Sequence, residues 1–321
     1  MKTAIEYSRI IEDTIKSLNL PTERLGGLYL PIEYGMSEGG KRLRPVLTLM
    51  ACEAFGKSYE EAVKAGVALE MYHNFTLLHD DVMDNSDMRR GRPTVHRKWD
   101  ANTAILSGDT MLTLATQLVM NVDNSILRDV LDTFNQMSID VFEGQQMDMD
   151  FESRDDVSLD EYMTMITGKT SALLGCAAKI GAIVAGCSKQ DAESMYRFGV
   201  ALGLAFQIQD DYLDVYGDEA TFGKPIGGDI LNNKKTFLML SALKADEEAS
   251  NLRQTMQMPA SVAKINAVRE IYDSLGIPEI CRKTIVEFSK EATDMIQSTS
   301  MCEEGKAMFK NLIENLVGRT R

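Results

Sequence analysis

The sequence predicts an all-α protein, on the basis of its composition, its proline distribution and its lack of linkers. The 321-residue chain is 44% hydrophobic and 26% charged, an ordinary globular composition that can form a large core. It has 7 prolines, with none between Pro93 and Pro225, and this interval is rich in residues that favour helices. No Ser-, Gly- or Pro-rich linker interrupts the chain. We therefore expect one helical domain that covers residues 1–321.

The individual helices are predicted from apolar residues at helical spacing and from the residues that begin or end each run. Pro21 ends the first helix, and a glycine-led basic turn over residues 39–45 precedes the second. Ser58 is a candidate N-cap, with Glu61 at the capping-box position, and it begins a long helix that ends near Asp84. The expected helices cover residues 1–18, 46–55, 59–84, 101–122, 125–150, 159–168 and onward, 190–217, 233–245, 259–275, 278–297 and 303–317.

Charge and cysteine content exclude several classes of protein. With 34 basic and 48 acidic residues the net charge is −14, which argues against nucleic acid or an anionic membrane as the main partner. The 5 cysteines have no C-x-x-C spacing and are expected to be small buried hydrophobes in a reducing cytosol. The N-terminus lacks the apolar core of a signal peptide, and the longest apolar run, Leu173 to Cys187, is too short to span a bilayer. We expect a soluble, cytoplasmic protein without stable membrane insertion.

Two short acidic motifs carry the strongest functional signal. Residues 80–84 and residues 210–214 each read Asp-Asp-x-x-Asp, and each closes an apolar stretch that is typical of a helix. Residues four apart share a helix face, so the outer carboxylates of each motif converge. Either motif alone could be a solvated helix end. Buried carboxylates need partners, however, and Mg²⁺ that also binds substrate phosphates is the natural occupant.

Basic residues near these motifs indicate phosphate binding. Lys41 and Arg44 lie in the glycine-led turn, and Arg89 and Arg90 follow the first acidic motif in a basic loop over residues 85–97. Guanidinium groups match phosphate oxygens bidentately, so loop arginines beside an aspartate cluster are well explained as diphosphate clamps. Two cationic groups of separate origin predict two phosphate sites, of which only one needs metal ions.

These residues resemble a known family. The chain is similar, over essentially its whole length, to the trans-isoprenyl diphosphate synthases of the polyprenyl synthetase family. Each motif alone is weak, and their order and spacing together make the resemblance specific. The segments that carry the resemblance are Gly39 to Pro45, Leu78 to Asp84, Arg89 to His96, Gly168 to Thr170, Phe206 to Asp214, and Gly228-Asp229 with Lys234 and Thr236.

The resemblance implies an antiparallel helical bundle around a deep central cavity, assembled as a homodimer. It implies a reaction in which isopentenyl diphosphate condenses with an allylic diphosphate (dimethylallyl, geranyl or farnesyl). Three Mg²⁺ ions are expected, with Asp80, Asp84 and Asp210 as ligands. Asp81, Asp211 and Asp214 are expected to act through waters or as secondary ligands.

The resemblance also assigns the remaining site residues. The allylic diphosphate is expected to contact Arg89, Lys169 and Lys224, and also Lys234 when a glycine-rich lid over residues 222–229 closes. Isopentenyl diphosphate is expected to contact Lys41, Arg44, His73 and Arg90. The oxygens of Thr170 and Gln207 are expected to face the developing carbocation.

Product length is predicted from the helix that ends in the first acidic motif. At about 1.5 Å of rise per residue, Phe75 lies about 7–8 Å and Tyr72 about 12 Å below Asp80. The alternative is that both are plain core aromatics. In the family, a bulky residue five positions before the motif shortens the product, and here Phe75 holds that position while Thr76 beside it is small. This pattern predicts a product of fifteen to twenty carbons, with twenty preferred.

Two alternatives stay open on the sequence alone. A class I terpene cyclase also uses Mg²⁺ and an aspartate-rich motif, but cyclases usually lack a second full motif and the Gly-Gly-Lys-Arg segment. A noncatalytic subunit would be expected to lose acidic motif residues, and here both motifs are intact. The synthase is therefore the preferred interpretation.

Overall fold

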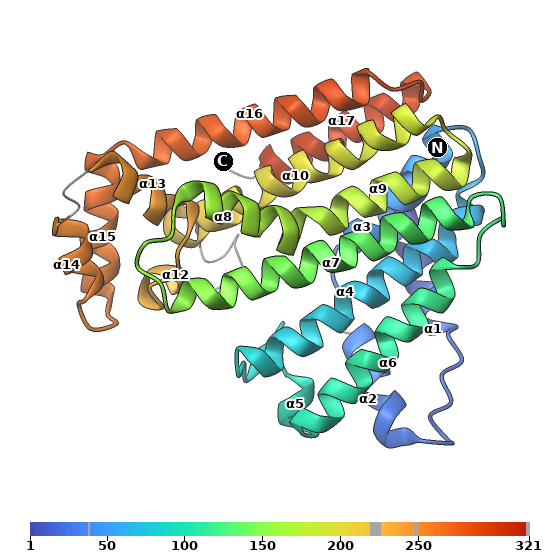
Figure 1. The fold of residues 1–321 in the computed structure, drawn as a ribbon, viewed down its shortest axis with the longest axis horizontal. Helices are drawn as coiled ribbons and strands as arrows, with labels where there is room; N and C mark the ends of the chain where they lie inside the picture. Colours follow the sequence, from blue (N-terminus) through green and yellow to red (C-terminus); the bar gives the residue numbers. More distant parts are fainter. Residues whose placement is uncertain (38, 219–225, 247–249, 319–321) are drawn as a thin grey trace. The chain divides into compact units, whose positions relative to one another are not determined.

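The computed structural model describes residues 1–37, 39–218, 226–246 and 250–318, and within these ranges it is all-α apart from one short hairpin (Figure 1). The chain divides into two compact units. The first comprises Met1–Asn135, Cys176–Met195 and Thr299–Lys306, and the second comprises Gln136–Gly175, Tyr196–Ser298 and Ala307–Arg321. The predicted all-α class is confirmed, and the single domain stays a prediction.

The N-terminal elements all belong to the first unit. They are α1 (Ala4–Lys16), α2 (Gly26–Met36), α3 (Leu43–Ala54), the 3₁₀ helix η1 (Tyr59–Ala62), α4 (Val63–Met83), the antiparallel strands β1 (Met88–Arg89) and β2 (Arg92–Pro93), α5 (Val95–Lys98) and α6 (Ala101–Val119).

Local capping residues explain where several of these helices begin. Thr3 and Glu6 form a reciprocal capping box that begins α1. Ser58 is an N-cap as predicted, but it accepts from the Glu60 N–H and begins the short η1, and α4 follows only from Val63. Helix α2 was not expected from the sequence, because Pro31 lies inside it and breaks the pattern of a regular helix. The basic loop over residues 85–97 also holds more structure than predicted, namely the hairpin and α5.

The core of the first unit forms around α4, which packs along α3 and α6. Leu69 and Tyr72 on α4 are fully buried. Helix α6 approaches α4 closely at Gly108, where an added Cβ would lie 2.3 Å from His79 Nε2. Glycine at this position therefore lets the helix that carries the first acidic motif pack tightly.

The remaining elements follow α6 in the chain. They are α7 (Leu127–Glu152), α8 (Leu159–Ile166), the π-helical turn η2 (Thr167–Ser171), α9 (Ala172–Ala185), α10 (Lys189–Tyr216), α12 (Gly228–Leu231), α13 (Phe237–Ala245), α14 (Ser250–Met256), α15 (Val262–Ser274), α16 (Ile277–Gln297) and α17 (Glu303–Val317).

Three of the predicted C-terminal helices differ from the observed ones. The helix expected from residue 159 onward contains η2, a one-turn π-helix. The helix expected from residue 233 begins later, since Asn233 has a left-handed φ of 53° and Thr236 caps α13. The helix expected over 259–275 begins at Val262, where Ser261 is the N-cap.

One apolar cluster forms the core of the second unit. It gathers buried residues of α8, α10, α13, α15 and α16, among them Tyr162, Ile208, Phe237, Tyr272 and Cys281. The second acidic motif lies on α10, so its helix is held by this core.

The apolar stretch and the cysteines can be compared with their predictions. Among the described residues, one helical stretch, Leu159–Ala185, is long and apolar enough to cross a membrane, and 67% of its most apolar window is buried inside the structure. Burial of this kind is typical of a core helix. Cys52, Cys176 and Cys281 are buried as predicted, but Cys187 is half-buried and Cys302 is exposed, so the expectation of five buried cysteines was wrong for these two.

Candidate active site

The first unit contains a cationic cluster around His73 on α4. Burial lowers the pKa of His73 well below its ordinary value, and the positive charges of four arginines lower it further. We use the name cationic cluster for His73 together with Arg42, Arg44, Arg89 and Arg90. Three of the four residues predicted to hold isopentenyl diphosphate, Arg44, His73 and Arg90, are thus brought together, and His73 is neutral at physiological pH.

The fourth predicted residue, Lys41, is exposed and lies in the turn that leads into α3. Arg90 donates a hydrogen bond to the carbonyl of Gly39 in the same turn. Gly40 has a φ of 140°, and an added Cβ there would lie 3.0 Å from Arg90 Nη1. The backbone conformation of Gly40 therefore favours glycine at this turn, and the Arg90 guanidinium packs closely against it.

Arg44 on α3 is a partly desolvated cation. Burial lowers the pKa of Arg44 to about 10, the charge of Glu70 opposes this shift, and the charge of Arg90 adds to it. Among the described residues, none accepts a hydrogen bond from its buried Nε. A cluster of arginines with an unsatisfied donor favours an anion, because a buried polar group without a partner is unfavourable.

The first acidic motif lies at the end of α4, and its aspartates have different surroundings. Asp81 is 4% exposed and accepts hydrogen bonds from Arg89 Nε at 2.9 and 3.1 Å. Asp80 is half-buried, and Asp84 is exposed at the C-cap of α4. Asp81 therefore orients Arg89, and the outer aspartates are the more accessible ones.

The second acidic motif, on α10, is more strongly tied to the protein. Asp211 is buried and accepts hydrogen bonds from the Tyr162 hydroxyl, from Gln207 Nε2 at 3.0 Å and from the Phe237 backbone N–H at 3.0 Å. Burial raises the pKa of Asp211 to about 6, although the bonds from Tyr162 and Phe237 act in the opposite direction. Asp211 thus joins α8, α10 and α13.

Asp214 and Asp210 complete this motif. Asp214 is 8% exposed and its Oδ2 accepts a hydrogen bond from the Asp229 backbone N–H at 3.0 Å. Its carbonyl accepts from Gly227 N–H at 2.6 Å, so it holds the start of α12. Asp210 is half-buried. In the second motif, as in the first, the leading aspartate is more accessible than the one that follows it.

The π-helical turn η2 presents Lys169 and Thr170. Lys169 forms an ion pair with Asp148 on α7, and Thr170 Oγ1 donates to Gln207 Oε1 at 3.1 Å. The turn lies directly on α7, because an added Cβ at Gly144 would lie 2.3 Å from the Lys169 backbone nitrogen. Single π-turns inside helices are often found at functional sites. This turn joins Thr170 to Asp211 through Gln207.

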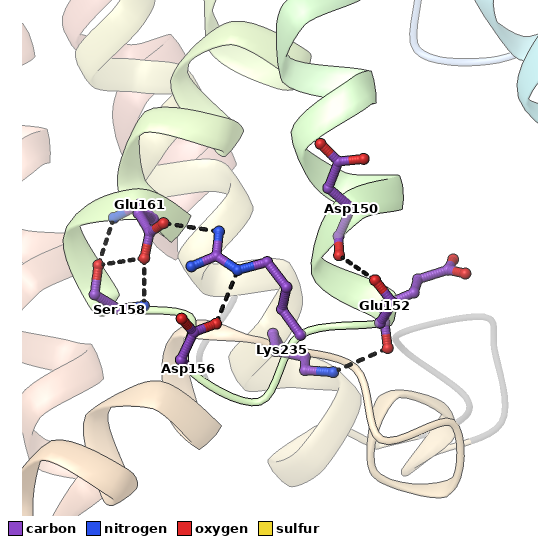
Figure 2. Close-up of polar contacts among 8 residues, drawn as sticks. Asp150, Glu152, Asp156, Ser158, Glu161 and Lys235 are labelled. Atoms are coloured by element: carbon purple, nitrogen blue, oxygen red, sulfur yellow. Dashed lines mark hydrogen bonds and ion pairs between the residues drawn. The ribbon is translucent and has the colours of Figure 1, made fainter.

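Lys234 lies in the turn between α12 and α13. Burial acts to lower its pKa, but the carboxylates of Asp229, Asp148, Asp211 and Asp210, in that order, outweigh burial and the pKa is raised. The turn is fixed at its neighbouring residues. Lys264 Nζ donates to Asn233 Oδ1 at 2.7 Å, and Lys235 Nζ donates to the Glu152 carbonyl at 3.3 Å (Figure 2).

The loop after α7 supports the same region. Figure 2 shows Glu161 and Ser158 bonded reciprocally, in the capping box that begins α8. The hydrogen bonds from Ser158 and Arg154 lower the pKa of Glu161 to about 2. Arg154 also pairs with Asp156, so this surface loop is held by several charged contacts.

The residues predicted to limit product length form an aromatic stack in the first unit. The ring centroid of Tyr72 lies 5.4 Å from that of Phe75 and 5.4 Å from that of Phe134 on α7, and both contacts are edge-to-face. Phe75 in turn contacts His79 at 4.8 Å. Thr76 is half-buried, and its Oγ1 donates to the His73 carbonyl at 2.8 Å. Their role in product length stays a prediction.

In each unit, sequence patterns did not indicate some of the residues that contact the predicted site residues. Asp148 pairs with Lys169, Tyr162 donates to Asp211, and Glu70 pairs with Arg42. Gln145 on α7 has both amide atoms buried, and no described residue bonds them. The polar pair Gln145 and Asp148, one turn apart in a helix that must bury one face, was the available signal.

One predicted site residue, Lys224, lies outside the described residues, as do residues 222–225 of the predicted lid. Among the residues that the structure describes, no group of three or more His, Cys, Asp or Glu side chains is arranged to hold a metal ion.

Comparison with known proteins identifies the family. The polyprenyl synthetase family matches residues 27–275. The geranylgeranyl diphosphate synthase of Methanosarcina mazei is 34% identical over 302 residues, covering 94% of this chain and 92% of that protein. The geranylgeranyl pyrophosphate synthase of Geoglobus acetivorans is 37% identical over 305 residues, covering 91% and 94%.

A solved structure gives the same result. A crystal structure of a geranylgeranyl pyrophosphate synthase superposes with a TM-score of 0.95 at 41% sequence identity, and the match covers 100% of both chains. Identity at this level over the full length extends the likeness beyond the fold. The chain therefore belongs to the polyprenyl synthetase family and is a prenyltransferase.

Proposed function

We propose that this protein condenses isopentenyl diphosphate with an allylic diphosphate to make an all-trans prenyl diphosphate of fifteen to twenty carbons, with geranylgeranyl diphosphate preferred. The observation that carries the proposal is the division within the acidic motifs: Asp81, Asp211 and Asp214 are buried and bonded to protein groups, whereas Asp80, Asp84 and Asp210 are more accessible. The relatives named geranylgeranyl diphosphate synthase support the twenty-carbon product.

The residues present fit magnesium. Mg²⁺ usually takes one or two carboxylates and completes its shell with water and substrate phosphates, so a cluster of three protein ligands is not required. Asp80 and Asp84 lie one turn apart at the end of α4 and are suited to this, and Asp210 is the corresponding accessible aspartate of the second motif. We assign three Mg²⁺ ions to these ligands. Bound Mg²⁺ would stabilise the charge that develops on the departing diphosphate.

The chain's own residues supply the rest of the chemistry at the allylic substrate. The residues that bind its diphosphate are Arg89, Lys169, Lys224 and Lys234. Asp81 orients the Arg89 side chain, and Asp148 orients the Lys169 side chain. The carbon–oxygen bond breaks and its electron pair leaves with the diphosphate. The oxygens of Thr170 and Gln207 then face the allylic cation, since lone pairs stabilise positive charge without trapping it.

The second substrate binds at the cationic cluster. Lys41, Arg44 and Arg90 contact the diphosphate of isopentenyl diphosphate, and neutral His73 donates a ring N–H to it without adding charge. The alkene attacks the allylic cation and forms the new carbon–carbon bond. One proton is then lost to the departing diphosphate, which balances the reaction.

Three further properties belong to the same proposal. Tyr72, Phe75 and Thr76 limit how far the growing chain extends. The protein is a homodimer, as the family resemblance implies. It is cytoplasmic and does not insert stably into a membrane, which the burial of the stretch Leu159–Ala185 supports.

A product assay tests the proposal. Purified protein with Mg²⁺ and labelled isopentenyl diphosphate is given dimethylallyl, geranyl or farnesyl diphosphate in turn, and products are identified by mass spectrometry. A dominant twenty-carbon diphosphate supports the proposal, and a chelator should abolish it. A hydrocarbon product would indicate a cyclase, whereas no turnover with any primer would indicate a noncatalytic subunit.

A further inference from the structure

Arg42 has an unusual backbone conformation in the middle of the predicted isopentenyl diphosphate site. It is the residue before the first turn of α3, and its φ of 47° and ψ of 39° are left-handed. Residues with a Cβ, apart from asparagine and aspartate, rarely adopt this conformation, because Cβ then crowds the backbone. Since Lys41 precedes Arg42 and Arg44 follows two residues later, the conformation of Arg42 sets how both are presented.

The side chain of Arg42 is held by a buried network. Its Nη1 forms an ion pair with Glu70 Oε1 at 2.6 Å, and the two side chains are 3% and 5% exposed. Its Nη2 donates to the Met36 carbonyl at 2.8 Å. Asn74 Nδ2 donates to the Glu70 carbonyl at 2.8 Å and to its Oε1 at 3.3 Å. Arg42 therefore ties together the end of α2, the start of α3 and the middle of α4.

The network of Arg42, Glu70 and Asn74 also reaches the part of α4 that carries His73. On α4, Asn74 directly follows His73, and Glu70 lies three residues, about one turn, before it. The opposite end of the turn, at Gly39 and Gly40, is held by Arg90. The turn that carries Lys41 is thus fixed from both ends by contacts within the first unit.

Stability alone is a poor explanation for this ion pair. Charges taken out of water lose hydration, and apolar side chains of similar size often stabilise a fold as well or better. What an ion pair adds is direction, since a guanidinium with two acceptors in fixed places has one orientation. These fixed contacts of the side chain also hold Arg42 in its left-handed backbone conformation.

We propose that Arg42 is a positioning residue for isopentenyl diphosphate: through Glu70 and the Met36 carbonyl it holds the turn in the conformation in which Lys41 and Arg44 meet the diphosphate. The inference rests on the proposed function, because it takes Lys41 and Arg44 as contacts of that substrate. Arg42 itself is too buried to be the main contact.

The decisive variant replaces the whole ion pair. Arg42→Met with Glu70→Met keeps side-chain volume and leaves no unpaired buried charge, so the protein should fold with a Tm near that of the wild type. The KM for isopentenyl diphosphate should rise about tenfold to a hundredfold, because small misplacement of binding groups has effects of that size. The KM for the allylic substrate should change less than about twofold.

A double-mutant cycle with Lys41 separates positioning from general damage. Lys41→Ala should raise the KM for isopentenyl diphosphate in the wild-type background but add little in the double methionine background, because the lysine is already displaced. Arg42→Lys, which keeps the charge but loses the two-acceptor geometry, should give an intermediate KM. Asp191→Asn is the matched control. It weakens another buried network in the same unit, at Ser188 and Ser300, and should lower Tm without changing either KM.

Each outcome decides the proposal. A folded double methionine variant with an unchanged KM for isopentenyl diphosphate overturns it, and so do equal rises in both KM values or additive effects with Lys41→Ala. If the double variant does not fold, Arg42→Lys decides by the same KM comparison at an unchanged Tm. Failure of the proposed function is distinguishable, because the wild-type protein would then show no elongation.

Discussion

Among single residues, burial separates the aspartates of the two motifs into two kinds. Asp81, Asp211 and Asp214 are at most 8% exposed and are bonded to protein groups. The other three aspartates of the two motifs are more accessible: Asp80 and Asp210 are half-buried, and Asp84 is exposed. The first kind is held within the fold of its own unit, and we propose the second kind as ligands of the Mg²⁺ that arrives with the substrate.

Substitution of Asp211 should therefore mainly lower stability, whereas substitution of Asp210 should mainly lower kcat. Asp211→Ala removes the acceptor for Tyr162, Gln207 and Phe237, and should destabilise the fold by about 2–4 kcal/mol. Asp210→Ala should cost less stability than Asp211→Ala, because Asp210 is more accessible, and should lower kcat at least about a hundredfold. Thermal unfolding and steady-state kinetics on both variants check this. A large loss of Tm in Asp210→Ala with normal kcat in the folded fraction would contradict it.

His73 predicts a pH dependence of stability. Its pKa is lowered in the folded protein, so the unfolded chain takes up a proton near pH 6.5 while the folded chain does not. The stabilisation is complete above about pH 6.5 and is lost as the pH falls below it, by up to about 1.4 kcal/mol per pH unit. His73→Gln should lack this component. Urea unfolding of both proteins at pH 7.5, 6.5 and 5.5 measures the unfolding free energy. If this free energy changes equally with pH in both proteins, His73 does not contribute to its pH dependence.

Among the elements, α7 and the turn η2 pack backbone against backbone. An added Cβ at Gly144 would lie 2.3 Å from the Lys169 nitrogen, and one at Gly168 would lie 2.5 Å from the Asp140 carbonyl. Backbone cannot move aside as a side chain can. The paired glycines therefore let η2 present Lys169 and Thr170.

Gly144→Ala should push η2 away from α7. We expect a loss of about 1–3 kcal/mol in unfolding free energy, as for overpacking in a core, and a fall in kcat because Lys169 and Thr170 move. Gly27→Ala is the control, since a Cβ there meets no atom within 4 Å and should be neutral or slightly stabilising. Wild-type kcat in Gly144→Ala would show that the position of η2 is not critical.

The aromatic stack on α4 predicts product length at the same scale. If Tyr72 and Phe75 limit the growing chain, Phe75→Ala should lengthen the product, and Tyr72→Ala should extend it further in the double variant. Because the two rings contact each other and Tyr72 also contacts Phe134, the effects should not be additive. Mass spectrometry of products from farnesyl diphosphate measures this. Unchanged product length in the double variant would show that Tyr72 and Phe75 are core residues without a role in product length.

For the whole molecule, magnesium should matter for catalysis and not for folding. We expect Mg²⁺ to arrive with the substrate diphosphate at the accessible aspartates Asp80, Asp84 and Asp210, so folding should not depend on it. A chelator should therefore leave the Tm of the substrate-free protein unchanged. Mg²⁺ with inorganic diphosphate should raise Tm in the wild type and less in Asp80→Ala. A fall in Tm on adding chelator alone would contradict this.

The sequence by itself determined the helical class, most helix positions and the family, because these depend on local spacing and on motifs that adjacent residues carry. It also named the acidic motifs and most of the cationic cluster. It did not separate Asp210 from Asp211, since adjacent identical residues have the same local pattern and differ only in what packs against them. The left-handed Arg42 and its ion pair with Glu70, 28 residues away, needed the tertiary structure for the same reason.

The misses have a common physical cause. Helix α2 contains a proline, η2 looks like ordinary helix in sequence, and Asp148 shows its role only when Lys169 lies beside it. Helix periodicity records which residues face a core, but pairing between helices depends on how the elements pack. The local free energies of the chain thus decide its elements, and the partners of each buried charge are decided only when those elements meet.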